Sequence, residues 1–299
     1  MTQYVPTRKL KIIEFYITNV CNLTCKNCNR FNNFNFRGWQ KWQDYEHEYA
    51  QWAQNLKFDF ITILGGEPLL NPTILDWCQG IRRLWPESSI HLVTNGYHMN
   101  KVAGLYETIR DNKILLSVTL HNEHEESFIY GEVDKFLDGG KEKSRNEEKG
   151  YIHFEDRQLP TGVWTQKDYE FVTSALYKTP DNKFSLHNSD PHIAHDHCTF
   201  ANGKTYHFVR GKLYKCGPVA LFPEFDSQHS LDISDSDRQL INSYEPFSAE
   251  DFAQRSDEIL EKIDQPLPQC KFCPENYETS QIFATRKGSA KTINIIDRS

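Results

Sequence analysis

The sequence predicts an α/β protein with a parallel sheet, followed by a smaller C-terminal domain that binds metal through cysteines. Three observations support this prediction. Apolar, β-branched runs alternate with segments of helical periodicity, cysteine clusters stand near both ends, and 299 residues suffice for two unequal domains. We place the larger domain at 1–190 and the smaller one at 191–299.

Strand-like runs and helical patterns alternate along the first domain. The alternation predicts a parallel sheet with right-handed crossovers, in which ligands gather at the carboxyl ends of the strands. Helical spacing runs from Trp39 to Leu56, from Ile74 to Trp85 and from Val102 to Ile109. The predicted strands are 11–18, 58–64, 89–94 and 114–121, with weaker ones at 151–155 and 183–187.

Three further side-chain patterns have simple interpretations. The Trp and Tyr stripe of the first helix indicates core packing, and Cys78 on the apolar face of the second helix indicates a buried, inert thiol. The charged, glycine-bounded segment 139–150 predicts a mobile loop and a candidate substrate lid.

Bulk properties exclude several classes of protein. The formal net charge of -7 disfavours a nucleic-acid scaffold. No stretch approaches the roughly eighteen apolar residues of a membrane helix, and the first residues lack an apolar signal region. Seven of the eight cysteines stand in metal-ligand spacings, which favours a reducing, cytoplasmic location over disulfides.

Cys21, Cys25 and Cys28 form C-x3-C-x2-C directly after the first strand-like run. Three thiolates can ligate three irons of a 4Fe-4S cluster and leave the fourth iron open for a small chelating ligand. A structural zinc site would use four ligands. This spacing predicts an iron-sulfur site, with zinc as the alternative.

A second cysteine set lies near the C-terminus. Cys198 and Cys216 flank a predicted hairpin whose turn contains Gly211, and Cys270 and Cys273 form C-x2-C. Four thiolates fit either a structural zinc or an auxiliary 4Fe-4S cluster, and spacing alone leaves both open.

The motifs carry a family resemblance. The segment CNLTCKNC, followed by GGEP at 65–68, resembles the radical S-adenosylmethionine superfamily, which implies a partial (βα)6 barrel. The C-x12-G-x4-C pattern and the final C-x2-C resemble the SPASM and twitch subfamilies, and in particular the twitch arrangement of 2-deoxy-scyllo-inosamine dehydrogenase. The resemblance implies a catalytic 4Fe-4S cluster, bound S-adenosylmethionine and a four-cysteine auxiliary 4Fe-4S cluster in a small C-terminal domain.

The resemblance also implies roles for individual residues. Cys21, Cys25 and Cys28 would ligate the catalytic cluster, and Cys198, Cys216, Cys270 and Cys273 the auxiliary one. Candidate cofactor contacts are Gly65, Gly66 and Glu67 to the methionine amino group, Asn95 to ribose or substrate, Thr119 to the cofactor, and Arg157 to the methionine carboxylate.

Histidines supply the candidate acids and bases. His121 replaces an aspartate of the family pattern, and His187 begins a histidine-rich approach to Cys198. We take these two as candidate catalytic residues. Irregular spacing disfavours a third metal site among His187, His192, His195 and His197.

These expectations combine into a function. We expect reductive cleavage of S-adenosylmethionine to a 5'-deoxyadenosyl radical and hydrogen abstraction from the substrate, in a net oxidation of a small metabolite, sugar or nucleotide. An electron donor such as flavodoxin or ferredoxin would be the partner. The alternatives are a peptide-modifying maturase, a redox-neutral isomerase or epimerase, and, least favoured, a non-enzymatic metal-binding module.

Overall fold

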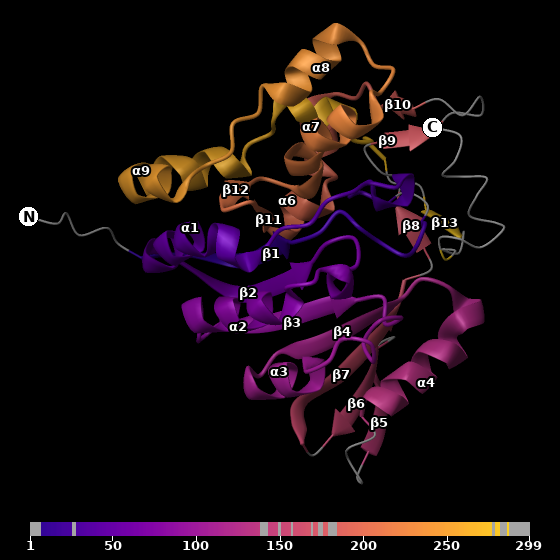
Figure 1. Ribbon diagram of the computed structural model, residues 1–299. Coiled ribbons are helices and arrows are strands. Elements are labelled where there is room, and N and C mark those ends of the chain that lie inside the picture. Colours follow the sequence, from indigo (N-terminus) through magenta and orange to yellow (C-terminus); the bar gives the residue numbers. More distant parts are fainter. Residues whose placement is uncertain are drawn as a thin grey trace, which may run out of the picture.

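The computed structural model describes residues 7–25, 28–137, 143–148, 151–156, 158–168, 170–172, 176–178, 184–276, 279–281 and 286. Its main element is a sheet of nine described strands in the order β12-β11-β1-β2-β3-β4-β7-β6-β5 (Figure 1). These strands are β1 (Arg8–Tyr16), β2 (Leu56–Leu64), β3 (Ser89–Thr94), β4 (Leu115–Leu120), β5 (Lys143–Glu148), β6 (Tyr151–Asp156), β7 (Leu159–Lys167), β11 (Thr205–Val209) and β12 (Lys212–Tyr214).

Parallel pairing dominates this sheet. β11, β1, β2, β3, β4 and β7 pair in parallel, whereas β12, β6 and β5 extend the two edges in antiparallel fashion. The α/β fold with a parallel-dominated sheet is therefore confirmed, and it is consistent with a partial radical SAM barrel. Because β11 pairs directly with β1, the sheet crosses the domain boundary predicted at residue 190, and that boundary stays a prediction.

The two weaker strand predictions need correction. The strand predicted at 151–155 forms β6, but it pairs antiparallel to β7 and has no crossover helix. The strand predicted at 183–187 forms β10 (Phe184–Leu186), which pairs with β9 (Leu176–Lys178) outside the main sheet. A second small sheet joins β8 (Glu170–Val172) to β13 (Thr279–Gln281). Hydropathy can predict a strand but not the strand with which it pairs. The two remaining parallel strands of the main sheet are β7, which pairs with β4, and β11, which pairs with β1.

The predicted loop at 139–150 is also wrong in part. Lys143–Glu148 form the edge strand β5 against β6, and the rest of that segment lies outside the described residues. A polar strand at a sheet edge contains no apolar run from which a sequence pattern could predict it, because backbone hydrogen bonds hold it in the sheet.

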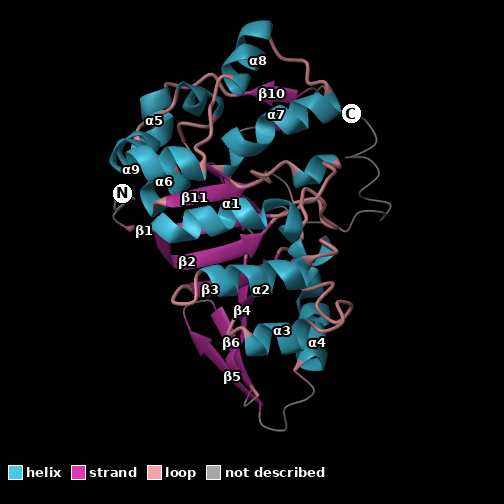
Figure 2. Ribbon diagram, turned by 60° about the vertical axis from the view of Figure 1, so that its left-hand side comes forward, coloured by secondary structure: helices cyan, strands magenta, loops and turns pink. Residues whose placement is uncertain are grey.

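Helices pack against the sheet and make up most of the described C-terminal part of the chain. α1, α2 and α3 lie side by side along the sheet, and α7, α8 and α9 gather beyond β11 and β12 (Figures 1 and 2). The helices are α1 (Trp42–Asn55), α2 (Ile74–Leu84), α3 (Leu105–Asp111), α4 (Glu126–Phe136), α5 (Pro191–Asp196), α6 (Thr199–Gly203), α7 (Gly217–His229), α8 (Asp235–Asn242) and α9 (Ala249–Asp264). Short 3-10 turns are η1 (Asn32–Phe34), η2 (Pro68–Leu70), η3 (Glu123–Glu125) and η4 (Pro268–Phe272).

Aromatic side chains fill the space between the sheet and α1 and α2. Phe15 of β1 contacts the rings of Tyr49, Trp77 and Phe208, with centroids 5.1, 6.4 and 5.1 Å away. All four side chains are fully buried, as is the free thiol of Cys78. The prediction of core packing is confirmed for Trp42 and Tyr49 of the aromatic stripe, and so is the burial of Cys78, whereas Trp39 precedes α1 and is 43% exposed. No described helix is long and apolar enough to span a bilayer.

Candidate functional site

A cavity of about 470 Å³ opens where the parallel strands end, and we call it the strand-end cavity. It brings together the three N-terminal cysteines, both glycines of the GGEP turn, and Asn95, Thr119 and His121 of the other predicted residues. Its lining is Glu14, Cys21, Leu23, Cys25, Cys28, Asn29, Arg30, Asn32, Asn33, Thr62, Leu64, Gly65, Gly66, Val93, Thr94, Asn95, Thr119, His121, Gln166 and Asp168.

The three cysteines lie on the loop that follows β1. The Leu23 amide donates to Cys21 Sγ at 3.4 Å, and Cys28 Sγ lies 3.7 Å from Asn32 Oδ1. Burial raises the pKa of the Cys25 thiol well above its usual value, and the nearby Cys21 and Cys28 add to this effect. Thiols crowded in this way ionise readily only beside positive charge, which is what metal ligation supplies. Three thiols that line one cavity are the donor set that a 4Fe-4S cluster with one open iron would use.

The GGEP turn approaches the cysteine loop through backbone contacts. Gly66 N donates to Thr18 O at 2.7 Å, and Glu67 N donates to Val20 O at 2.8 Å. A Cβ on Gly66 would lie 2.4 Å from Val20 O and 2.9 Å from Cys21 Cβ. Glycine is required here because the turn and the start of the cysteine loop touch backbone to backbone.

Glu67 follows β2 and hydrogen-bonds to the end of the neighbouring strand β3. Its fully buried carboxylate accepts hydrogen bonds from Thr94 Oγ1 (2.6 Å), Asn95 N (2.8 Å) and Leu69 N (3.0 Å). Burial raises its pKa to about 7, and these three donors partly oppose that rise. The carboxylate is engaged inside the protein, whereas Gly65 and Gly66 line the cavity itself.

The remaining predicted contacts divide into three groups. Asn95, Thr119 and His121 line the strand-end cavity, and Asn95 Nδ2 donates to Asn22 Oδ1 at 2.8 Å. His187 follows β10 and is not among the described residues that line this cavity. Arg157 lies outside the described residues.

The environment of His121 is acidic. Its Nδ1 lies 3.8 Å from Asp168 Oδ2, and Asp168 also lines the cavity. Burial lowers the pKa of His121, while Asp168 opposes the change. A neutral imidazole beside a carboxylate can accept a proton at this position.

The sequence predictions missed a charged cluster on the cavity wall. Glu14 Oε2 lies 2.7 Å from His207 Nε2 and forms an ion pair with Arg30. Burial disfavours the charge on Glu14, but Arg30 and His207 outweigh burial and hold its pKa at about 2. One sequence signal for this cluster was available. Glu14 is an acidic residue inside a mostly apolar strand, and a carboxylate is rarely buried without a partner.

A second cavity, of about 40 Å³, collects all four C-terminal cysteines, and we call it the four-cysteine cavity. Cys198 and Cys216 directly precede α6 and α7, and Cys270 and Cys273 lie in and after η4. Most of the other lining is apolar: Ala194, His195, Phe200, Ala201, Lys215, Pro218, Val219, Phe222, Ile241, Leu267, Gln269 and Phe272.

The local structure explains why these cysteines converge. β11 and β12 form the predicted hairpin, with Gly211 at φ +73° in its turn, which brings Cys216 back towards Cys198. Burial raises the pKa of Cys273, and Cys216, Cys198 and Cys270 raise it further. The four thiols are therefore close enough to influence one another. Within the described part of the chain, no group of three or more His, Cys, Asp or Glu side chains has the arrangement of a metal-ion site.

A thin wall of side chains separates the two cavities. Arg30 lines the strand-end cavity, Phe200 lines the four-cysteine cavity, and the guanidinium lies 5.8 Å from the ring centroid. Phe200 also packs edge-on against His207, with centroids 5.1 Å apart. His207 in turn contacts Glu14, which faces the strand-end cavity.

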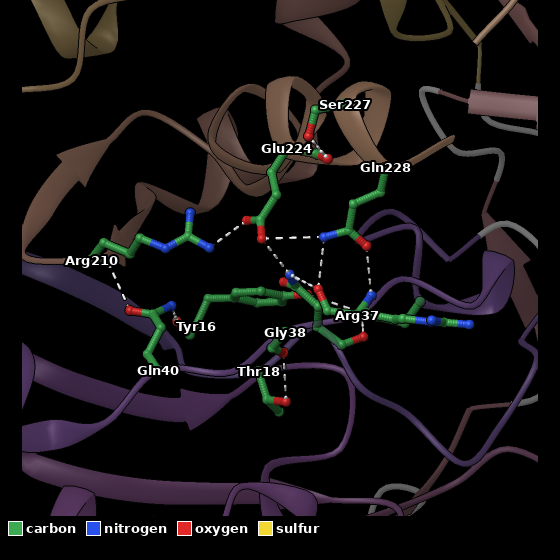
Figure 3. Close-up of polar contacts among 11 residues, drawn as sticks. Tyr16, Thr18, Arg37, Gly38, Gln40, Arg210, Glu224, Ser227 and Gln228 are labelled. Carbon is green, nitrogen blue, oxygen red and sulfur yellow. Dashed lines mark hydrogen bonds and ion pairs between the residues drawn. The ribbon is translucent and has the colours of Figure 1, made fainter. Parts of the chain in front are cut away.

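Polar contacts join α7 to the segments on either side of the cysteine loop and to the turn between β11 and β12 (Figure 3). Glu224 accepts from Arg210 Nη2 at 2.6 Å and from Asn19 Nδ2 at 3.1 Å. Gln228 exchanges two hydrogen bonds with the Arg37 backbone, at 2.9 and 3.0 Å. These contacts hold the C-terminal region against the first cysteine loop.

Comparison with solved structures finds weak overall likeness. SuiB of Streptococcus suis bound to S-adenosylmethionine is 20% identical with a TM-score of 0.35, over 42% of this chain and 31% of that chain. BtrN in complex with AdoMet and 2-DOIA is 19% identical with a TM-score of 0.39, over 54% and 58%. Native anSMEcpe with bound AdoMet is 16% identical with a TM-score of 0.34, over 42% and 40%.

This chain thus matches less than two thirds of the length of each of these proteins. No curated protein matches the sequence significantly. The family model described as "Radical SAM superfamily" matches residues 15–147. These residues contain the cysteine loop, the GGEP turn and the strands β2 to β4. Residues 15–147 are therefore a domain of the radical SAM superfamily.

Proposed function

We propose that this protein is a radical SAM enzyme that carries out a net oxidation of a small polar molecule, with a second 4Fe-4S cluster in the four-cysteine cavity. The radical SAM domain implies S-adenosylmethionine and one 4Fe-4S cluster. When bound, that pair supplies a 5'-deoxyadenosyl radical, which abstracts a hydrogen atom. The observation that carries the proposal is the thin wall between the two thiol-lined cavities.

The lining of the strand-end cavity includes two sets of residues with different chemistry. Cys21, Gly66 and Asn95 lie next to one another at the GGEP turn, and this set would hold S-adenosylmethionine. Glu14 and Arg30 form an ion pair in the same lining and would offer charged groups to a substrate. A substrate bound there would lie between the cofactor and the four-cysteine cavity.

The size and polarity of this cavity favour a small substrate over a peptide. About 470 Å³ accommodates a cofactor fragment together with a compact molecule. A buried acceptor, Asn33 Oδ1, lines the cavity and lacks a hydrogen-bond partner among the described atoms. Such a group favours a ligand with hydroxyl or amine donors.

After a hydrogen atom has been abstracted, the two-electron oxidation is completed when the substrate radical loses one proton and one electron. His121, beside Asp168, would accept the proton at its imidazole. The four thiolates would complete the coordination of the second cluster, so the substrate would not bind its iron. We assign electron transfer to this cluster, and structural support of the small domain is the alternative role. A reducing cytoplasm would keep the thiols free, and a flavodoxin or ferredoxin would supply electrons for the first step.

Cofactor content and product formation test the proposal together. The chain is reconstituted anaerobically, its iron, sulfide and zinc are counted, and 5'-deoxyadenosine is measured with dithionite. We expect about eight irons, four per cluster. Cys25→Ala should abolish 5'-deoxyadenosine, whereas Cys270→Ala should halve the iron and retain that product.

Two results would contradict parts of the proposal. About four irons with one zinc would remove the electron-accepting role of the second site. Intact clusters without 5'-deoxyadenosine would exclude radical chemistry. Regeneration of S-adenosylmethionine during turnover would instead favour a redox-neutral isomerase.

A further inference from the structure

Lys215 is a buried cation in the lining of the four-cysteine cavity. It follows β12 and precedes Cys216, and only 6% of its surface is exposed. Lysine is among the residues least often buried, because removing its ammonium from water is costly without a negative partner. Its position therefore calls for a compensating charge.

Among the described residues, the hydrogen-bond acceptor of the Lys215 ammonium is a neutral carbonyl. Lys215 Nζ donates to the Ile263 carbonyl at 2.6 Å. The nearest candidate carboxylate, Asp264, accepts instead from Lys204 at 2.7 Å and from the Tyr206 hydroxyl. In the described part of the chain, Lys215 makes no ion pair with any carboxylate.

Lys215 lines the same cavity as all four cysteines and directly precedes Cys216. Once a cluster is bound, the thiolates would be the negative groups closest to this side chain in the cavity lining. His195 also lines the cavity. Burial and then Lys215 lower the pKa of His195, so near neutral pH that imidazole adds no positive charge.

We propose that Lys215 is the charge-compensating residue of the auxiliary cluster, and that its ammonium raises the cluster's reduction potential so that it accepts the substrate's electron. This inference rests on the proposed function, because it requires a 4Fe-4S cluster on the four cysteines. A cluster held by four thiolates is anionic, and reduction adds one more negative charge. A fixed cation nearby stabilises the reduced state more than the oxidised one.

Lys271 provides a matched control. It lies in η4 between Cys270 and Cys273, as close in sequence to the ligands as Lys215. Its ammonium pairs with Asp237 at 3.1 Å, and 28% of its side chain is exposed. Its charge is therefore already balanced and partly screened by water.

The test is a redox titration of the reconstituted full-length protein, followed by electron paramagnetic resonance. The auxiliary signal is identified as the one that persists in Cys25→Ala. Lys215→Met should lower the equilibrium constant for reduction at least about tenfold, which is about 59 mV for one electron. Lys215→Arg should restore most of the potential, and Lys271→Met should change the constant by less than about twofold.

Lys215→Gln keeps a donor for the Ile263 carbonyl and serves as the neutral variant if Lys215→Met does not assemble. Equal potentials in wild type and the neutral variants, with about eight irons in each, would overturn this inference and leave the proposed function standing. Zinc in the four-cysteine cavity of the wild type would overturn both, and the metal count distinguishes that result from an unchanged potential.

Discussion

The guanidinium of Arg30 lies over the ring of Phe200, 5.8 Å from its centroid, although the two residues line different cavities. Arg30 follows the cysteine loop of the radical SAM domain, and Phe200 belongs to α6 beside Cys198. The contact is therefore the point at which the two thiol-lined cavities adjoin. Its consequences for stability and electron transfer can be measured.

Arg30→Met should destabilise the protein by about 3 kcal/mol, because it leaves the Glu14 carboxylate buried without its strongest partner. Urea unfolding of the metal-free chain measures the change. Arg30→Met combined with Glu14→Gln should recover much of the loss, since neither charge then remains. A double variant no more stable than Arg30→Met would contradict a charge-pairing origin.

The acid stability of the protein should depend on Glu14. Its pKa is about 2 in the folded protein against 4.5 ordinarily, so its contribution is complete above pH 4.5 and is lost as pH falls towards 2. The difference in unfolding free energy between wild type and Glu14→Gln should shrink by about 3 kcal/mol across that window. A difference independent of pH would show that Glu14 is not held ionised.

Glu67 should produce the opposite dependence on pH. Burial raises its pKa from 4.5 to about 7, so the stability from its protonated form is complete below pH 4.5 and is lost as pH rises through 7. Wild type should lose stability relative to Glu67→Gln over this range. Thr94→Val removes a donor that holds the pKa down and should move the window to higher pH. An unmoved window would contradict this assignment.

Gly66→Ala should destabilise the chain by at least about 2 kcal/mol and weaken S-adenosylmethionine binding, since the new methyl group would meet Val20 O at 2.4 Å. Equilibrium binding and urea unfolding measure the two effects. Gly131→Ala in α4 is the control. A Cβ there meets nothing within 4 Å, so the change should stabilise the helix by up to about 1 kcal/mol. Equal effects of the two substitutions would refute the close backbone approach.

Cys78 should be alkylated more slowly than the other seven cysteines in the native, metal-free chain, because those seven are partly exposed and Cys78 is buried. Its thiol is fully buried and burial raises its pKa to about 12, so little thiolate is present. Mass spectrometry after brief iodoacetamide treatment identifies the modified positions. Early modification of Cys78 would contradict its place in the core.

Local patterns predicted much of the fold and the candidate site. The strand and helix periodicities located β1 to β4 and α1 to α3, and the hairpin around Gly211 was correctly predicted. The cysteine spacings and the GGEP turn pointed to groups that line common cavities. These predictions succeed because they depend only on short segments. Apolar periodicity shows which face of a strand or helix is buried, and the cysteine ligands lie close together in the sequence.

Local sequence patterns could not predict which distant segments pair with one another. β6 and β10 had the composition of strands, yet β6 pairs antiparallel and β10 lies outside the main sheet. The ion pairs of Glu14 with Arg30 and His207 join three distant segments, and no local pattern encodes that convergence.

The sequence by itself determined which residues can bind metal and where strands give way to ligand loops, because those features follow from residue type and spacing. Only the tertiary structure decided that β11 joins β1, that Arg30 meets Phe200 and that Lys215 is buried beside four thiols. Each of these contacts joins segments that are distant in the sequence. The free-energy cost of burying a charge depends on the groups around it, and those groups are known only once the chain has folded.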